Sequence, residues 1–293
     1  MNTSPFHPDL RLAATLLPSA VVTPSLLPLI RRVTSANGKD TTEVARIGDG
    51  VSVRVHRPAG ARSRTAGVLW IHGGGYVLGT AEQNDALCCH FAAELGAVVV
   101  AVDYRLAPEY PYPAALDDCY HALQWLGAQP DVDAERIAIA GASAGGGLAA
   151  ALALAARDRG GVQPIFQLLS YPMLDDRSVR PDLETGHFRL WNTSANRFGW
   201  ESYLGTADPA EAVPARRTDL AGLAPAWIGV GTLDLFHSEN IAYAERLRAA
   251  GVPCETLEVN GAFHGFDEVL ACAGISRTYR AAQVAALLSA LLA

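Results

Sequence analysis

Seven short apolar runs alternate with helix-length segments along this 293-residue chain, and this alternation constrains its fold more than any other feature. The run at 51–55 is apolar at every second position, as in a strand with one buried face. The others are interpreted as strands covered on both faces. They occupy 67–71, 97–102, 137–140, 165–169, 226–230 and 255–259.

Helical patterns fill the spaces between these runs. They cover 81–95, 114–127, 144–159, 239–250 and 275–292. Regular alternation of strand and helix predicts an α/β protein with a mostly parallel sheet and helices on both faces. A chain of this length that is 50% apolar can bury a large core, and α/β folds of about 250 residues often form one domain. We therefore expect one catalytic domain over 41–293.

Two segments depart from the alternation. Residues 1–40 resemble short helical pieces broken by prolines, with apolar residues on one side. Residues 172–223 hold several prolines and two tryptophans without a clean period. An insertion of that size is more typical of a lid or specificity element than of sheet core.

Composition excludes several classes of protein. The net charge is −7 and the basic residues do not cluster, which argues against nucleic-acid binding. The apolar stretch 12–30 contains three prolines and lacks a basic segment before it, so neither a membrane span nor a signal peptide is expected. Five irregularly spaced cysteines predict buried free thiols and a cytoplasmic location.

The segment 141–145 reads Gly-Ala-Ser-Ala-Gly, between the apolar run 137–140 and the helical pattern 144–159. A G-x-S-x-G pattern between strand and helix predicts a sharp turn that exposes a nucleophilic serine. Glycines flank such a serine because a Cβ at either position would collide with neighbouring backbone. We therefore predict that Ser143 is the nucleophile.

Three consecutive glycines follow His72 directly after the run 67–71. Backbone N–H groups of such a loop, with that of the residue after the nucleophile, stabilise the oxyanion in hydrolases of this type. The predicted donors are Gly74, Gly75 and Ala144, and Gly73 could replace one of them. His72 is interpreted as a residue that shapes the loop.

Chain order selects the other two members of a catalytic triad, because acid and then histidine follow the serine in this fold. His264 lies in a glycine-flanked loop after the last predicted strand, and Asp234 follows the strand before it. They are the predicted base and acid, with Asp234 orienting the imidazole. The weaker candidates are His187 and His237 for the base, and Glu239 and Asp267 for the acid.

Together these stretches resemble the hormone-sensitive lipase-like carboxylesterases, the HGGG-loop bacterial family IV of the α/β-hydrolase superfamily. The matching stretches are His72 to Gly79, Asp103 to Glu109, Tyr112 to Asp117, Gly141 to Gly146, Gly231 to Asp234 and Phe263 to Phe266. The resemblance implies an eight-stranded α/β-hydrolase sheet and a helical cap, built from 1–40 and an insertion at about 180–215.

The chain departs from the family pattern at two places. Ala142 stands where the family usually has aspartate before the nucleophile. After Asp234 the sequence reads Leu-Phe-His-Ser, and the second aspartate of the family pattern is missing. Neither departure removes a member of the predicted triad.

The resemblance implies a serine esterase that hydrolyses short- to medium-chain carboxylic esters through an acyl-enzyme, without metal or organic cofactor. The expected partner is a small-molecule ester. The last helix, 275–292, could serve a dimer contact or pack on the sheet, and the resemblance favours a homodimer. The alternatives are a catalytically silent binding protein, or amide hydrolysis, dehydration or acyl transfer on the same fold.

Overall fold

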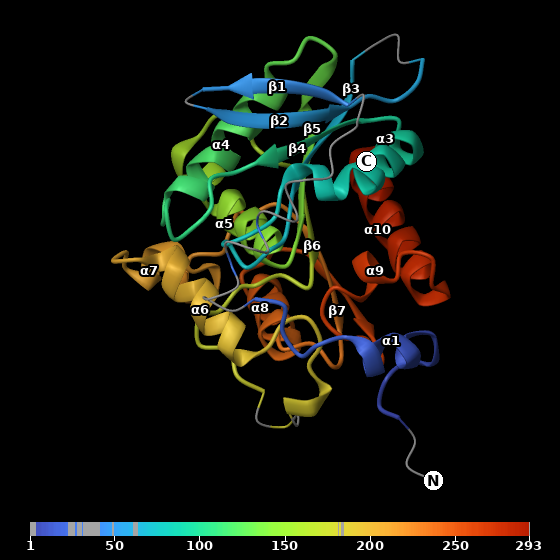
Figure 1. Cartoon of the computed structure of the whole chain (residues 1–293). Coiled ribbons are helices and arrows are strands. Elements are labelled where there is room, and N and C mark those ends of the chain that lie inside the picture. Colours follow the sequence, from blue (N-terminus) through green and yellow to red (C-terminus); the bar gives the residue numbers. More distant parts are fainter. Residues whose placement is uncertain are drawn as a thin grey trace.

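The computed structural model describes residues 4–22, 27, 31, 42–48, 50–60, 64–180, 182 and 185–292. Its centre is one sheet with the strand order β1-β2-β4-β3-β5-β6-β7-β8 (Figure 1). The bounds are β1 Glu43–Ile47, β2 Val51–His56, β3 Thr65–Ile71, β4 Val98–Asp103, β5 Val132–Ala142, β6 Phe166–Ser170, β7 Ala226–Gly231 and β8 Cys254–Val259. This confirms the predicted eight-stranded sheet.

Pairing in the sheet is parallel from β4 to β8 and antiparallel at the β1–β2 end. All seven predicted runs lie in strands. The eighth strand, β1, was not located in the sequence, because its burial pattern leaves only Ile47 fully buried. The parallel strands all end at one edge of the sheet, and the residues that follow β5, β7 and β8 meet there.

Helices cover both faces of the sheet, as predicted. Figure 1 shows α4 and α5 on one side and α3 and α10 on the other. Side chains alternate accordingly: Leu69 and Ile71 join the core under α4 and α5, while Val68 and Trp70 join the core under α3 and α10. The long helices are α3 Asp85–Leu95, α4 Ala114–Gly127, α5 Ala144–Arg159, α8 His237–Ala249 and α10 Gly274–Leu292.

The 12-residue helix α6 and several shorter elements complete the described chain. They are η1 Pro8–Leu10, α1 Arg11–Leu16, η2 Ala81–Asn84, η3 Thr185–His187, α6 Thr193–Leu204, α7 Pro209–Ala212, η4 Pro214–Arg216 and α9 Phe266–Val269. Helices η1 and α1 agree with the short helical pieces expected in 1–40. Most of 23–41 lies outside the described residues. Helix α6 lies within the expected insertion, whose sequence has no clean helical period.

The N-terminal segment lies against the insertion. The Val21 N–H donates to the Leu190 carbonyl at 3.0 Å, and the Leu190 N–H donates to the Pro18 carbonyl at 2.9 Å. Arg189 donates through Nε to the Ala14 carbonyl and places its guanidinium 5.0 Å from the Phe6 ring centroid. Two segments about 170 residues apart in sequence therefore form one layer.

The last helix packs on the sheet through buried Tyr279, Val284, Leu287 and Leu291. Packing on the sheet was one of its two expected roles, and the homodimer stays a prediction. No helix within the described ranges is both long and apolar enough to cross a membrane.

Candidate active site

Ser143 lies at the turn between β5 and α5. Its backbone has φ 56° and ψ −122°, a left-handed conformation that non-glycine residues rarely adopt. Its N–H donates to the Ser170 carbonyl at 2.9 Å, and its carbonyl accepts from the Gly147 and Met173 N–H groups. Bonds to β6 and to the segment after it therefore hold the turn and keep the Ser143 side chain at the carboxyl edge of the sheet.

The flanking glycines are required by close backbone contacts. A Cβ on Gly145 would lie 2.0 Å from the Ile71 carbonyl oxygen, and one on Gly141 would lie 2.4 Å from the Gly145 carbonyl oxygen. Real Cβ atoms do not approach backbone this closely. The glycine spacing therefore lets the turn pack against the end of β3, where the predicted oxyanion loop begins.

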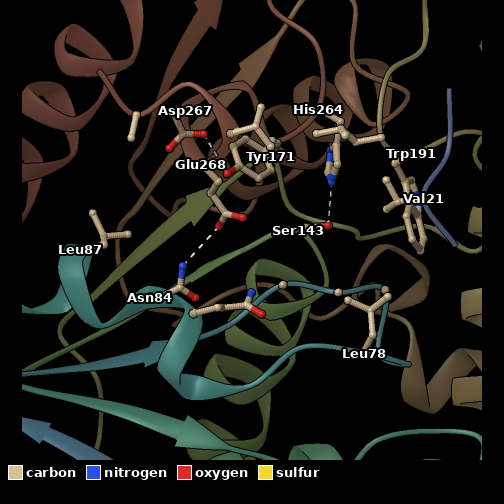
Figure 2. Close-up of a pocket in the computed structure, with 18 of the residues that line it drawn as sticks. Val21, Leu78, Asn84, Leu87, Ser143, Tyr171, Trp191, His264, Asp267 and Glu268 are labelled. Atoms are coloured by element: carbon tan, nitrogen blue, oxygen red, sulfur yellow. Dashed lines mark hydrogen bonds between the residues drawn. The ribbon is translucent and has the colours of Figure 1, made fainter. Parts of the chain in front are cut away.

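Three predicted residues meet at the edge of the sheet (Figure 2). The Ser143 Oγ lies 2.8 Å from His264 Nε2, and His264 Nδ1 lies 2.8 Å from Asp234 Oδ2. All three are nearly inaccessible, with exposed fractions of 6%, 7% and 0% for Ser143, His264 and Asp234. Such a chain can pass a proton from the hydroxyl to the imidazole while the carboxylate fixes its tautomer.

The Asp234 carboxylate is itself held in place. Its Oδ1 accepts the Phe236 N–H at 2.9 Å, which leaves Oδ2 directed at the histidine. Arg180 donates through Nη1 to the Asp234 carbonyl at 2.9 Å. The His264 ring lies between the edges of Tyr171 and Phe236, with ring centroids 5.0 and 5.1 Å away. Packing and hydrogen bonds together orient the imidazole.

The weaker candidates lie elsewhere. His237 pairs with Glu258 at 2.6 Å, and His187 packs against Phe6. Glu239 Oε1 accepts the N–H groups of Leu174 and Asp175 at 2.6 and 3.2 Å. Asp267 accepts the Tyr171 hydroxyl at 2.9 Å. Each of the four has a different partner, whereas Asp234 bonds to His264.

The predicted oxyanion loop lies beside Ser143. A Cβ on Gly73 would lie 3.3 Å from the Ser143 Cβ, so the loop passes directly next to the nucleophile. Among the described residues, the backbone N–H groups of Gly73, Gly74, Gly75 and Ala144 have no intramolecular acceptor. These donors are available to a ligand atom at Ser143, and the choice between Gly73 and its neighbours stays open.

His72 is buried beneath this loop. Its Nδ1 lies 2.8 Å from the Gly73 carbonyl oxygen, and its ring stacks on Tyr104 at 4.1 Å between centroids. Burial lowers the pKa of His72, so the imidazole is neutral at pH 7. These contacts agree with the interpretation of His72 as a residue that shapes the loop.

A cavity of about 540 Å³ opens over Ser143 and His264. Figure 2 shows Trp191 and Val21 to one side of Ser143, and Glu268 and Asn84 to the other. Sequence reasoning missed most of this lining. The lining comes from short pieces far apart in sequence, which no local pattern connects.

An eight-stranded α/β sheet with a serine elbow, a hydrogen-bonded histidine and carboxylate, and a glycine-rich loop defines a hydrolase of the α/β type. The family model described as alpha/beta hydrolase fold matches residues 68–268. The chain belongs to this family, and within it to the hormone-sensitive lipase-like carboxylesterases of family IV.

Relatives with similar sequences are named as esterases. Esterase LipI of Mycobacterium tuberculosis is 42% identical over 207 residues, covering 68% of this chain and 65% of LipI. The match therefore spans just under two thirds of that relative. Carboxylesterase NlhH of the same species is 37% identical over 254 residues, covering 83% and 77%. A bacterial heroin esterase structure superimposes with a TM-score of 0.87 at 37% identity, covering 98% of both chains. The chain is a carboxylic ester hydrolase.

Proposed function

We propose that the chain hydrolyses short- to medium-chain carboxylic esters through an acyl-enzyme on Ser143. The observation that carries this proposal is the continuous hydrogen-bonded chain from Ser143 through His264 to Asp234, beside a loop of unpaired N–H groups. A silent binding protein would not need this proton path. Family membership alone would leave the residues unassigned.

In the proposed mechanism, Ser143 Oγ attacks the ester carbonyl while His264 Nε2 takes the hydroxyl proton. Asp234 holds the imidazole and stabilises the imidazolium. The N–H groups of Gly74, Gly75 and Ala144 bind the oxyanion of the tetrahedral intermediate. His264 then gives its proton to the leaving alcohol. In deacylation, water attacks the acyl carbonyl while His264 Nε2 takes its proton, and His264 returns that proton to Ser143 Oγ as the acid leaves.

The cavity volume supports short and medium chains. Its 540 Å³ must hold both the acyl and the alcohol part of the ester. Initial rates on p-nitrophenyl acetate, butyrate, octanoate and palmitate should be highest at butyrate or octanoate and fall sharply at palmitate. Fastest turnover on palmitate would instead indicate a long-chain lipase, and no Ser143-dependent turnover on any ester would favour a binding role.

Substitution of Gly75 should test the proposed oxyanion loop. Gly75 has φ +59°, and an added Cβ would lie 2.0 Å from Trp191 Cη2. Because the loop must shift, we expect Gly75→Ala to lower kcat about 100- to 1,000-fold, as loss of an oxyanion donor does. Initial rates on p-nitrophenyl butyrate measure this effect.

Gly96 provides a matched control for that variant. It has the same φ of +59°, but a Cβ there meets no atom within 4 Å. Gly96→Ala should therefore cost only backbone strain of about 1–2 kcal/mol and leave kcat unchanged. Equal kcat in the two folded variants would contradict the assignment of Gly75.

Residues 1–40 and about 180–215 are proposed to form the cap over the catalytic domain 41–293. The backbone bonds between Val21, Leu190 and Pro18 support this, and so does the presence of Val21, Leu190 and Trp191 in the cavity lining. The cap thereby supplies the apolar wall of the substrate cavity.

A cytoplasmic location is also proposed. None of the five cysteines, all of which lie within the described residues, is joined in a disulfide, as expected in a reducing compartment. The expectation that they are all buried was wrong: Cys88 and Cys119 are buried, while Cys89 and Cys272 are exposed.

A further inference from the structure

The cavity over Ser143 has one apolar and one polar side. Trp191, Val21 and Leu78 line the first, and Glu268 and Asn84 stand opposite in Figure 2. A simple alkyl ester needs no acidic group near its scissile bond. The polar side, here called the acidic arm and defined by Glu268 and Asn84, therefore calls for a function of its own.

Glu268 is an acidic side chain without a cationic partner. It lies on the short helix α9, four residues after His264, and is accessible from the cavity. Within the described part of the chain, no basic group lies within 4 Å of its carboxylate. A carboxylate that lines a cavity and forms no ion pair gains from a cationic ligand.

Asn84 fixes this carboxylate from across the arm. Asn84 is 5% exposed, and its Nδ2 donates to Glu268 Oε1 at 3.4 Å. Its Oδ1 has no hydrogen-bond partner among the described residues. That oxygen is itself buried, so Asn84 acts here through its Nδ2 group, which holds the Glu268 carboxylate in place. Its helix η2 is anchored by the Ala81 N–H, which donates to Asp103 Oδ1 at 3.1 Å.

The remaining charges near the arm leave it acidic. Arg280 lines the same cavity, but its Nη2 donates to the Asp267 carbonyl at 2.7 Å and it pairs with no carboxylate among the described residues. Its charge offsets one of the two carboxyls of Asp267 and Glu268. His90 is half exposed and lies 4.0 Å from Glu94.

We propose that the acidic arm binds a protonated amine carried by the ester substrate, with the Glu268 carboxylate, held by Asn84, as its ion-pair partner. An ammonium N–H can donate to this carboxylate, whereas an alkyl or hydroxyl group would not neutralise Glu268. This inference rests on the proposed ester hydrolysis and names its substrate class: esters that bear an amine.

The environment of Glu268 supports this assignment. Partial desolvation by the cavity walls, followed by the neighbouring Asp267 charge, raises the pKa of Glu268 to about 7. Burial also raises the pKa of Asp267, although the Tyr171 hydroxyl opposes that shift. A bound ammonium would favour the ionised form of Glu268, which its desolvation and the Asp267 charge otherwise disfavour.

The test compares esters that differ only in the amine. On the alcohol side, 2-(dimethylamino)ethyl acetate is matched by 3-methylbutyl acetate, in which CH replaces N–H⁺. On the acyl side, ethyl 4-(dimethylamino)butanoate is matched by ethyl 5-methylhexanoate. The readout is the ratio of kcat/KM for the amine ester to that for its neutral partner, measured for wild type, Glu268→Gln and Glu94→Gln.

We expect wild type to prefer the amine in one pair, which also shows which part of the ester enters the arm. Glu268→Gln should lower that ratio about tenfold while kcat/KM for the neutral ester stays near wild type. Glu94→Gln removes an exposed charge nearby and should leave the ratio unchanged. A ratio near one in both pairs, or one that Glu268→Gln leaves unchanged, would overturn the proposal.

Turnover of the neutral esters separates the two proposals. If they are hydrolysed and the amine gives no advantage, only the acidic arm is refuted; if neither ester of a pair is hydrolysed, the proposed function itself fails.

The ratio should also rise with pH through about 7 as Glu268 ionises. Glu268→Gln should give a flat ratio, because any pH dependence that the two esters share cancels in the ratio. A wild-type ratio that is flat across this range would count against Glu268 as the partner.

Discussion

Ser143→Ala should lower kcat on p-nitrophenyl butyrate on the order of 10⁶-fold without unfolding the protein. Among the described residues, the only side-chain hydrogen bond of Ser143 is the one between Oγ and His264, so the variant loses the nucleophile and little else. The turn itself is held by backbone bonds to Ser170, Gly147 and Met173, which alanine preserves. Initial rates and thermal unfolding together measure this outcome.

Ser276 offers a matched control. It is fully buried in α10, and its Oγ has no partner among the described residues. Ser276→Ala should keep wild-type turnover. If Ser143→Ala remained active at more than about a thousandth of the wild-type rate, another residue would have to act as nucleophile, and the proposed mechanism would be wrong.

Asp234→Asn should lower kcat on the order of 10⁴-fold. Asparagine can still accept the Phe236 N–H through Oδ1, which turns its NH₂ group toward His264 Nδ1. The histidine must then accept at Nδ1 and carry its proton on Nε2. In that tautomer Nε2 already carries a proton and cannot take the proton of Ser143. His264 therefore cannot act as the base, although its position is kept.

Glu239→Gln is the comparison that makes this result specific. Glu239 was the second candidate for the acid, but it is bound to the Leu174 and Asp175 N–H groups, and a glutamine oxygen can accept both. Its turnover should stay close to wild type at pH 7. If Glu239→Gln were inactive and Asp234→Asn active, Glu239 would be the acid in place of Asp234.

The sheet and the long helices could be predicted because their sequence signal is local. Buried parallel strands need continuous apolar runs, and helices such as Ala114–Gly127 and Ala144–Arg159 appear at the expected bounds.

Helix α6 was missed because Gly199 interrupts its pattern. A Cβ at that position would lie 2.8 Å from the Gly75 carbonyl oxygen, so a tertiary contact explains the glycine. The Asn192 side chain, which accepts the Ala195 N–H, was the local signal that could have located the helix.

The catalytic candidates could be predicted because each follows a strand in a recognisable turn, and chain order limits the choices. The substrate cavity could not. Asn84, Trp191 and Glu268 come together only through the sheet topology and the insertion, and no local pattern links them. Glu268 carried one weak signal, its position one helical turn after the predicted base.

The first segment of the chain supplies part of the cavity wall without belonging to the sheet. Val21 and Val22 line the cavity, and the His7 N–H donates to the Gly261 carbonyl at 2.9 Å, three residues before His264. Substrate range can therefore diversify by exchange of a short N-terminal peptide while the hydrolytic machinery stays untouched. For directed evolution, a library confined to the exposed and half-buried positions of residues 4–22 would sample new pocket shapes while it keeps the buried core residues Phe6, Leu10, Ala14 and Val22.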